Sequence, residues 1–174
     1  MTARVTTLRG EEAGGYYLDA LPHYYTEAGE PPGRWYGALA TQLGLTGQVD
    51  EPAFVDLMAG RNPLSGGLLG RAYGKNAVRG YDVTFLAPKS VSVLWAVAGN
   101  RVQGEVEAAH DAAVDAVLGF VERQAHTRVC QRGQVVQVDA SGLAVAVFRH
   151  LSGGDRGPRS ERGLARHPAG RSAW

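Results

Sequence analysis

The segment that most constrains the fold is residues 106–124, because it carries the clearest helical periodicity in the chain. Its apolar residues recur at intervals of three or four positions, which places them along one side of an α-helix. These positions are Val106, Ala109, Ala113, Val117 and Val121. The segment is therefore predicted to form an amphipathic helix with one buried side.

Strand patterns follow this helix and decide the fold class. Residues 135–138 and 143–148 are rich in β-formers, and the turn residues at 139–142 between them are typical of a β-hairpin. Elsewhere the patterns predict strands at 4–8 and 81–86, and helices at 11–25, 35–43, 52–58 and 88–98. Helices combined with antiparallel strands predict an α+β fold, an antiparallel β-sheet with flanking helices.

Composition narrows the setting of the protein. A chain of 174 residues with 44% hydrophobic content suits one compact domain with a real core. Its single cysteine, Cys130, excludes an internal disulfide and a cysteine-cluster zinc site, which fits a reducing compartment. No stretch approaches the roughly 20 apolar residues that cross a bilayer. We therefore expect a cytoplasmic protein with no membrane partner.

The character of the sequence changes after His150. Residues 151–174 consist largely of Arg, Gly, Pro, Ser and Ala and show no periodicity. Such a composition cannot bury enough apolar surface to offset the entropy of ordering. We therefore expect a domain at residues 1–150 and a disordered Arg/Gly-rich tail at 151–174.

Two tyrosine pairs near the N-terminus are the first candidates for chemistry. Tyr16-Tyr17 and Tyr24-Tyr25 hold four of the seven tyrosines of the chain. A phenol is a poor nucleophile at neutral pH, since its unperturbed pKa is about 10. The tyrosines therefore need a base or a cation nearby to react.

Asp82 is the first candidate for that base. It interrupts an apolar strand pattern, where a carboxylate is costly unless it is paired or lies at a cleft. It could accept a tyrosine proton or orient a metal-binding histidine. The alternative is an edge-strand aspartate that faces water, and the pattern alone leaves both open.

Other polar residues have weaker signals. The segment 61–80 is a predicted loop, and its Arg71, Lys75 and Arg79 are candidate phosphate contacts, although a solvated basic loop is an equal alternative. His110 and His126 lie on or just after the long predicted helix. We interpret both as packed or capping histidines rather than as metal ligands.

One run of residues resembles a known family. Residues 80–92 read Gly-Tyr-Asp-Val-Thr-Phe-Leu-Ala-Pro-Lys-Ser-Val-Ser, which closely resembles the signature of TrwC-type conjugative relaxases, the MobF class of HUH single-strand DNA nickases. The tyrosine pairs, Trp-Tyr-Gly at 35–37, Ala-His-Asp at 109–111 and Phe-Arg-His at 148–150 follow in the family's order. The resemblance covers residues 1 to about 150.

The resemblance implies a relaxase (HUH palm)-like fold and a reaction. Such a protein would bind single-stranded DNA at an origin of transfer and cut it by tyrosine attack, leaving a 5′-phosphotyrosyl link. Tyr16 matches the first nucleophile and Tyr24 the nucleophile of the terminating strand transfer, with Tyr17 and Tyr25 as supporting partners.

Further roles are implied by the same match. Asp82 matches the acidic residue that assists the tyrosine, and His150 matches the first of three histidines that hold a divalent metal, Mg or Mn. Lys89, inside the matched run, joins the candidate DNA-binding residues. Accessory conjugation proteins are further candidate partners.

The chain departs from the family pattern after His150. The family's other two histidines follow about a dozen residues later as a His-x-His pair on a further strand, but here that interval reads Glu161-Arg162-Gly163. The later His167 stands alone in the tail. We therefore expect a truncated relaxase whose C-terminal strand is missing, with the last 24 residues read out of frame or rearranged.

Two alternatives remain beside a relaxase that carries out catalysis. One is a non-catalytic remnant that binds single-stranded DNA through the basic loop and the N-terminal helices, with an affinity that falls as salt rises. The other is an unstable fragment without function. Formation of a covalent protein–DNA adduct would distinguish a catalytic relaxase from both alternatives.

Overall fold

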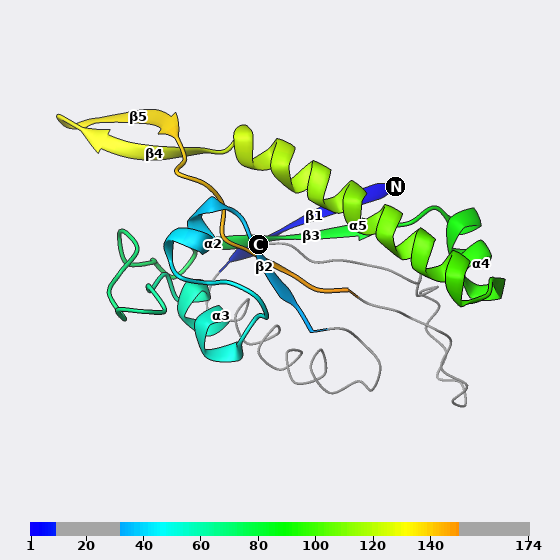
Figure 1. Cartoon of the computed structure of the whole chain (residues 1–174). Coiled ribbons are helices and arrows are strands. Elements are labelled where there is room, and N and C mark those ends of the chain that lie inside the picture. The colour runs from blue at the N-terminus through cyan, green and yellow to red at the C-terminus, as the bar shows by residue number, and fades with distance from the viewer. Residues whose placement is uncertain (10–31, 150–174) are drawn as a thin grey trace.

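The computed structural model describes residues 1–9 and 32–149. Short runs of strands and helices follow one another along this part of the chain (Figure 1). They are β1 Thr2–Arg9, β2 Arg34–Tyr36, α2 Ala38–Gln42, α3 Glu51–Met58, β3 Val78–Leu86, α4 Lys89–Val97, α5 Asn100–Arg123, β4 His126–Gln131, β5 Gln134–Asp139 and β6 Val145–Val147. The α+β class predicted from the sequence is confirmed. In this described part, no helix combines the length and apolar content needed to cross a bilayer.

The described strands form three antiparallel two-stranded ladders rather than the single sheet predicted. β1 pairs with β3, β2 with β6, and β4 with β5. Among the strands at 1–9 and 32–149, β3 is therefore hydrogen-bonded only to β1, and β6 only to β2. Each of these strands has one edge that no described strand covers.

The predicted hairpin around residues 139–142 is wrong. β5 pairs instead with β4, a strand that was not predicted from the sequence. β6 pairs with β2. The turn lies at Arg132 and Gly133, whose φ angles of 51° and 79° are the positive pair that a type I′ hairpin turn requires. The resulting β4–β5 ribbon projects from the end of α5 (Figure 1).

The predicted helix at 35–43 is also only partly correct. Trp35 lies in β2 opposite Ala146, and the helix starts at Ala38. Gly37 separates the two elements with a φ of 105°, a conformation that residues with a side chain rarely adopt. The strand and helix therefore meet at a glycine that ends the extended backbone.

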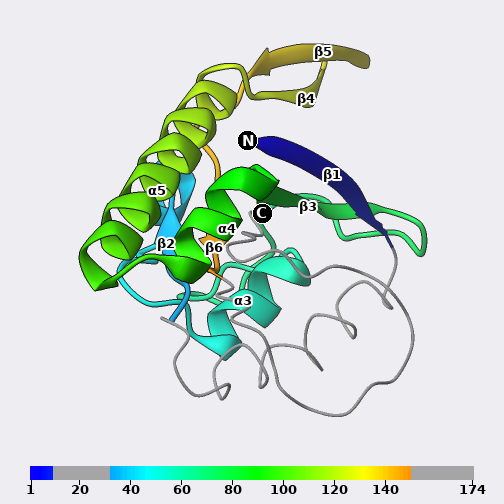
Figure 2. The ribbon, with the colours of Figure 1, turned by 90° about the vertical axis from the view of Figure 1, so that its right-hand side faces the viewer.

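The β2–β6 ladder lies between two apolar cores. Because successive side chains of a strand point to opposite faces, Val145 and Val147 join one core and Ala146 the other. The first core contains Phe85 of β3 with Val114 and Leu118 of α5. The second contains Trp35, Phe148 and the buried side of α3. Figure 2 shows α5 and α3 on different sides of this ladder.

Helix α5 is tied to the rest of the fold by a line of carboxylates that we call the acidic stripe. It consists of Glu107, Asp111, Asp115 and Glu122. The first three are spaced four residues apart, so they lie on one side of the helix. Asp115 pairs with Arg34 of β2, and Glu122 accepts backbone hydrogen bonds from Ala38 and Leu143 at 2.7 and 2.9 Å.

Candidate functional site

Asp82 lies in the middle of β3, opposite Thr6 of β1. Its neighbours Val83 and Phe85 pack toward α5, so alternation directs Asp82 to the opposite face of the ladder. The residue is half-buried, and its Oδ1 atom is shielded from solvent. This position favours a carboxylate in a protected site over an aspartate that simply faces water.

The predicted nucleophiles and the predicted metal ligand lie outside the described residues. Tyr16, Tyr17, Tyr24 and Tyr25 fall in 10–31, and His150 falls in 150–174. Their roles therefore stay predictions. Asp82 pairs with Thr6 of β1, and this strand ends at Arg9, directly before the sequence segment that carries the tyrosine pairs.

The predicted DNA contacts differ in how free they are. Arg71, Lys75 and Lys89 are exposed. Arg79 is half-buried at the start of β3, where its Nη1 donates to the Met58 carbonyl oxygen at 3.3 Å. Its guanidinium also lies 5.3 Å from the ring centroid of Tyr73. Arg79 thus connects β3 to α3 and the loop, while the three exposed cations are placed to meet a polyanion.

The loop between α3 and β3 also exposes apolar side chains. Leu64, Leu68 and Leu69 are among its exposed residues, and Tyr73 is 38% exposed. The Asn62 side chain accepts from the backbone nitrogens of Leu64 and Ser65, which fixes the start of the loop. A loop that combines cations with exposed apolar and aromatic side chains has the composition of a single-strand nucleic-acid surface.

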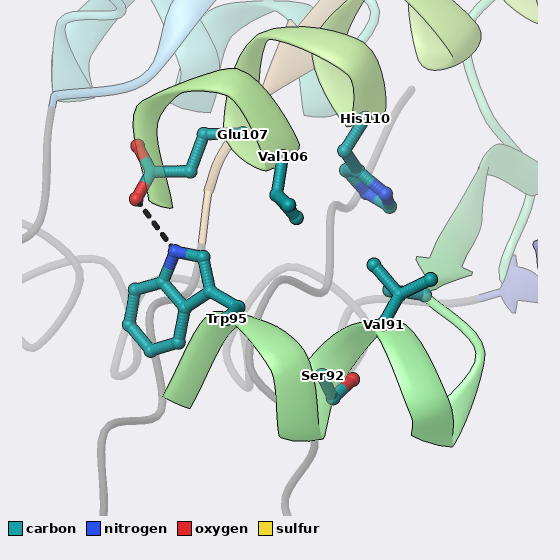
Figure 3. Close-up of a pocket in the computed structure, with 7 residues that line it drawn as sticks. Val91, Ser92, Trp95, Val106, Glu107 and His110 are labelled. Atoms are coloured by element: carbon teal, nitrogen blue, oxygen red, sulfur yellow. Dashed lines mark hydrogen bonds between the residues drawn. The ribbon is translucent and has the colours of Figure 1, made fainter. Parts of the chain in front are cut away.

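A small pocket lies between α4 and α5 (Figure 3). Its lining is Ala87, Val91, Ser92, Trp95, Val106, Glu107 and His110. His110 is 9% exposed and Ser92 is 6% exposed, so the interpretation of His110 as a packed residue is confirmed. His126 begins β4, and its Nδ1 lies 2.7 Å from the Gln124 carbonyl at the end of α5, as a capping histidine would.

Three residues near this pocket were not predicted from the sequence to have a role, namely Arg149, Glu107 and Asp111. The Nη1 of Arg149 donates to Glu107 Oε2 at 2.7 Å, and its Nη2 donates to Asp111 Oδ2. The other Glu107 oxygen accepts from Trp95 Nε1 at 2.9 Å. The available signal was the order Phe-Arg-His, which places Arg149 on the opposite face from Phe148, together with two acids four residues apart on the helix.

The described residues do not by themselves fit a divalent cation. In the part of the chain at 1–9 and 32–149, no three His, Cys, Asp or Glu side chains gather closely enough to hold a metal ion. Asp82 supplies one carboxylate, whereas Mg or Mn sites need several converging oxygen ligands.

Known proteins match this chain over most of its length. The family model described as TrwC relaxase matches residues 10–156. The multifunctional conjugation protein TraI of Escherichia coli is 40% identical over 148 residues, which is 84% of this chain and 8% of TraI. TraI of strain K12 matches to the same extent.

Solved structures of TrwC match the fold. TrwC complexed with a 27-mer DNA that comprises the recognition hairpin and the cleavage site gives a TM-score of 0.73 at 28% identity, covering 99% of this chain and 54% of that one. A metal-bound TrwC complex with oriT DNA gives 0.75 at 29%, covering 99% and 55%. This chain thus spans about half of the matched TrwC chains and a small part of TraI. The chain belongs to the TrwC relaxase family.

Proposed function

We propose that this chain is the nicking part of a conjugative relaxase, which cuts single-stranded origin-of-transfer DNA by tyrosine attack. The observation that carries the proposal is the family match over residues 10–156, which includes both tyrosine pairs, Asp82 and His150. The half-buried position of Asp82 supports it, since a base that acts on a phenol works best when shielded from water.

In the proposed step, the phenol oxygen of Tyr16 attacks the scissile phosphorus. The Asp82 carboxylate takes the phenolic proton as the new bond between phosphorus and tyrosine oxygen forms. The bond from phosphorus to the 3′ oxygen breaks, and the 3′ oxygen leaves with the bonding pair and takes up a proton. The 5′-phosphotyrosyl link conserves the energy of the bond for religation. Tyr24 performs the second transfer, with Tyr17 and Tyr25 as supporting partners.

The DNA contacts follow from the exposed cations. Arg71 and Lys75 on the loop and Lys89 at the start of α4 would pair with phosphates. Arg79 would act mainly by holding the loop, because its guanidinium already contacts Met58 and Tyr73. The partner is single-stranded DNA with an adjoining hairpin, the kind of DNA named for the solved TrwC complex.

A Mg or Mn ion and accessory conjugation proteins remain predictions from the family. The related TrwC structures include metal-bound and copper-bound forms. In the present chain, the predicted ligand His150 lies outside the described residues.

The test is formation of a covalent adduct. The whole chain is incubated with a pool of single-stranded oligonucleotides that carry a hairpin and an adjoining randomised segment, with Mg²⁺ or Mn²⁺ in parallel. The label is placed at the 3′ end, because the 5′-phosphotyrosyl fragment lies downstream of the nick. We expect a labelled band that survives denaturing electrophoresis and disappears after proteinase treatment.

Matched variants identify the nucleophile and the base. Tyr16→Phe should abolish the first adduct, whereas Tyr36→Phe, which changes a β2 tyrosine that packs against the core beside α5, should not. Asp82→Asn should slow adduct formation by about 10²-fold to 10⁴-fold, the usual contribution of a general base. Asp139→Asn, with a side chain that is 95% exposed, should have no effect. An adduct that persists in Tyr16→Phe would show that the nucleophile is misassigned.

The exposed cations of the loop favour one second candidate, a non-catalytic protein that binds single-stranded DNA. It predicts reversible binding that weakens as salt rises, with no covalent band. Arg71→Gln and Lys75→Gln would each lower the affinity and reduce the steepness of its salt dependence. The absence of any adduct with a bound oligonucleotide would favour this candidate.

A further inference from the structure

The regular part of the β1–β3 ladder carries one cation and one anion, Arg4 of β1 and Asp82 of β3. In this part, residues 2–8 pair with residues 80–86 without a shift of register. The other side chains of these two segments are all uncharged. Figure 2 shows the two strands side by side. Arg4 and Asp82 are therefore the only charged side chains that this part of the ladder presents.

Both charged residues lie on the same face of the ladder. Arg4 pairs with Thr84, and Asp82 pairs with Thr6, so the four residues form two cross-strand pairs that are two positions apart. Directly paired residues share a face, and so do residues two positions apart on one strand. Arg4 and Asp82 are thus diagonal neighbours. Such neighbours lie about 7–8 Å apart, within reach of a long side chain.

This face is covered at one end and open at the other. Leu8, on the same face, is buried in the second apolar core. Thr6 and Arg4, which lie further toward the N-terminus, are exposed. Asp82 lies at the border, half-buried and with its Oδ1 atom shielded from solvent. In the described part of the chain, the open surface beside Asp82 is therefore the one that carries Arg4.

The Arg4 guanidinium is available to a ligand. Within residues 1–9 and 32–149, no carboxylate pairs with it. Arg34 and Arg149, by contrast, are paired with carboxylates of α5. A guanidinium presents its N–H donors in a planar fork that matches two oxygens of a phosphate group. An arginine of this kind beside the proposed base has the chemistry of a phosphate-binding residue.

We infer that Arg4 binds the phosphate that faces Asp82 and is a further catalytic residue of this chain. The inference rests on the proposed function, in which Asp82 takes the phenolic proton. A base and a phenol share a hydrogen bond of about 2.6–3.2 Å, and the attacking oxygen starts about 3–3.5 Å from phosphorus. The scissile phosphate must therefore come within about 6 Å of the Asp82 carboxylate. At this distance its nonbridging oxygens are within reach of the diagonal neighbour Arg4.

Arg4 has two effects on the reaction. Its positive charge offsets the repulsion between the Asp82 carboxylate and the phosphate, which are both negative. It also donates hydrogen bonds to the nonbridging oxygens, where negative charge increases as the phenol oxygen attacks. Loss of one such donor in an enzyme lowers the rate about 10²-fold to 10³-fold.

The first experiment measures adduct formation by the full-length chain, with an oligonucleotide selected for tight binding from the hairpin pool described above. At saturating DNA, Arg4→Gln should lower the rate about 10²-fold to 10³-fold. The affinity should fall about tenfold or less, because one phosphate contact among several is lost. Arg4→Lys should recover part of the rate, since it keeps the charge but not the fork. Equal rates for the wild-type chain and Arg4→Gln would overturn the inference.

The neighbouring residue Val5 offers a matched control. It lies on the opposite face of β1 and is 63% exposed. Arg4→Gln combined with Val5→Arg keeps the net charge of the strand but moves the guanidinium to the wrong face. This double variant should react as slowly as Arg4→Gln alone. Recovery of the wild-type rate would show that the charge of the strand matters and not the place of Arg4, which would contradict the inference.

The second experiment does not depend on cutting. In NMR of the full-length chain with isotope-labelled arginines, the Nε–H signal of Arg4 is assigned by its loss in Arg4→Lys. The selected oligonucleotide should shift this signal and leave that of Arg101, whose side chain is 84% exposed on α5, in place. A shift of the Arg4 signal without any adduct would support the phosphate contact and contradict the proposed function. An Arg4 signal that does not move at saturating DNA would overturn the inference, even if the adduct forms.

Discussion

At the scale of single residues, a few side chains join segments that are distant in sequence. Glu122 is one of them, because its Oε1 accepts backbone N–H groups from Ala38, at the start of α2, and from Leu143, before β6. Negative charge at a helix N-terminus is also favourable. One carboxylate thus fixes two loops against the end of α5.

Replacement of Glu122 by Ala should therefore lower the free energy of unfolding. The expected loss is about 1–3 kcal/mol, because two N–H groups lose their acceptor. Glu122→Gln should lose less, since its amide oxygen can still accept. Urea denaturation measures the effect, with Glu105→Ala as the control, because Glu105 only pairs on the surface with Arg101. Equal losses for Glu122→Ala and Glu105→Ala would contradict this account.

Two glycines permit a test of backbone geometry. Gly37 has a φ of 105°, and a Cβ there would collide with the Leu143 carbonyl. Gly47 has a φ of 72° with open space around it. Gly47→Ala should cost about 1–2 kcal/mol from the left-handed conformation alone, and Gly37→Ala should cost clearly more. Thermal unfolding of both variants gives the comparison. A Gly37→Ala protein as stable as Gly47→Ala would mean that the loop at Leu143 moves freely.

At the scale of elements, local patterns predicted the long helix and the strand that carries Asp82 but not the pairing of strands. The turn Asp-Ala-Ser-Gly at 139–142 is a stronger hairpin signal than Arg132-Gly133, yet the latter forms the turn. β4 reads His-Thr-Arg-Val-Cys-Gln and has little apolar alternation. Its strand conformation comes from pairing with β5, which a local pattern cannot reveal.

The candidate site could likewise be predicted only in part from the sequence. The position of Asp82 in a strand followed from sequence, and its half-burial is consistent with a shielded base. The pairing of Arg149 with Glu107 and Asp111 was not predicted, since it depends on how α5 lies against the residues that follow β6. The same holds for Arg79, whose contacts with Met58 and Tyr73 exist only because α3, the loop and β3 converge.

At the scale of the whole molecule, the β4–β5 ribbon stands apart from the packed body. It contributes no residue to either apolar core. Its two ends meet, because the Ala140 nitrogen donates to the Ala125 carbonyl oxygen at 3.0 Å. Replacement of residues 126–139 by two glycines should therefore change the melting temperature by only a few degrees. Circular dichroism during heating measures this, and loss of cooperative unfolding would show that the body needs the ribbon.

The hydrogen bond between Ala140 and Ala125 closes the base of the β4–β5 ribbon, and this closure affects how the sequence of the ribbon can evolve. A segment that enters and leaves the body at one hydrogen-bonded pair can be lengthened, shortened or given different charges without repacking the interior. Mutations in the β4–β5 ribbon are then selected by their effect on what the ribbon contacts rather than by their effect on folding. Related sequences should accordingly diverge in length and charge between positions 126 and 139 more freely than along α5.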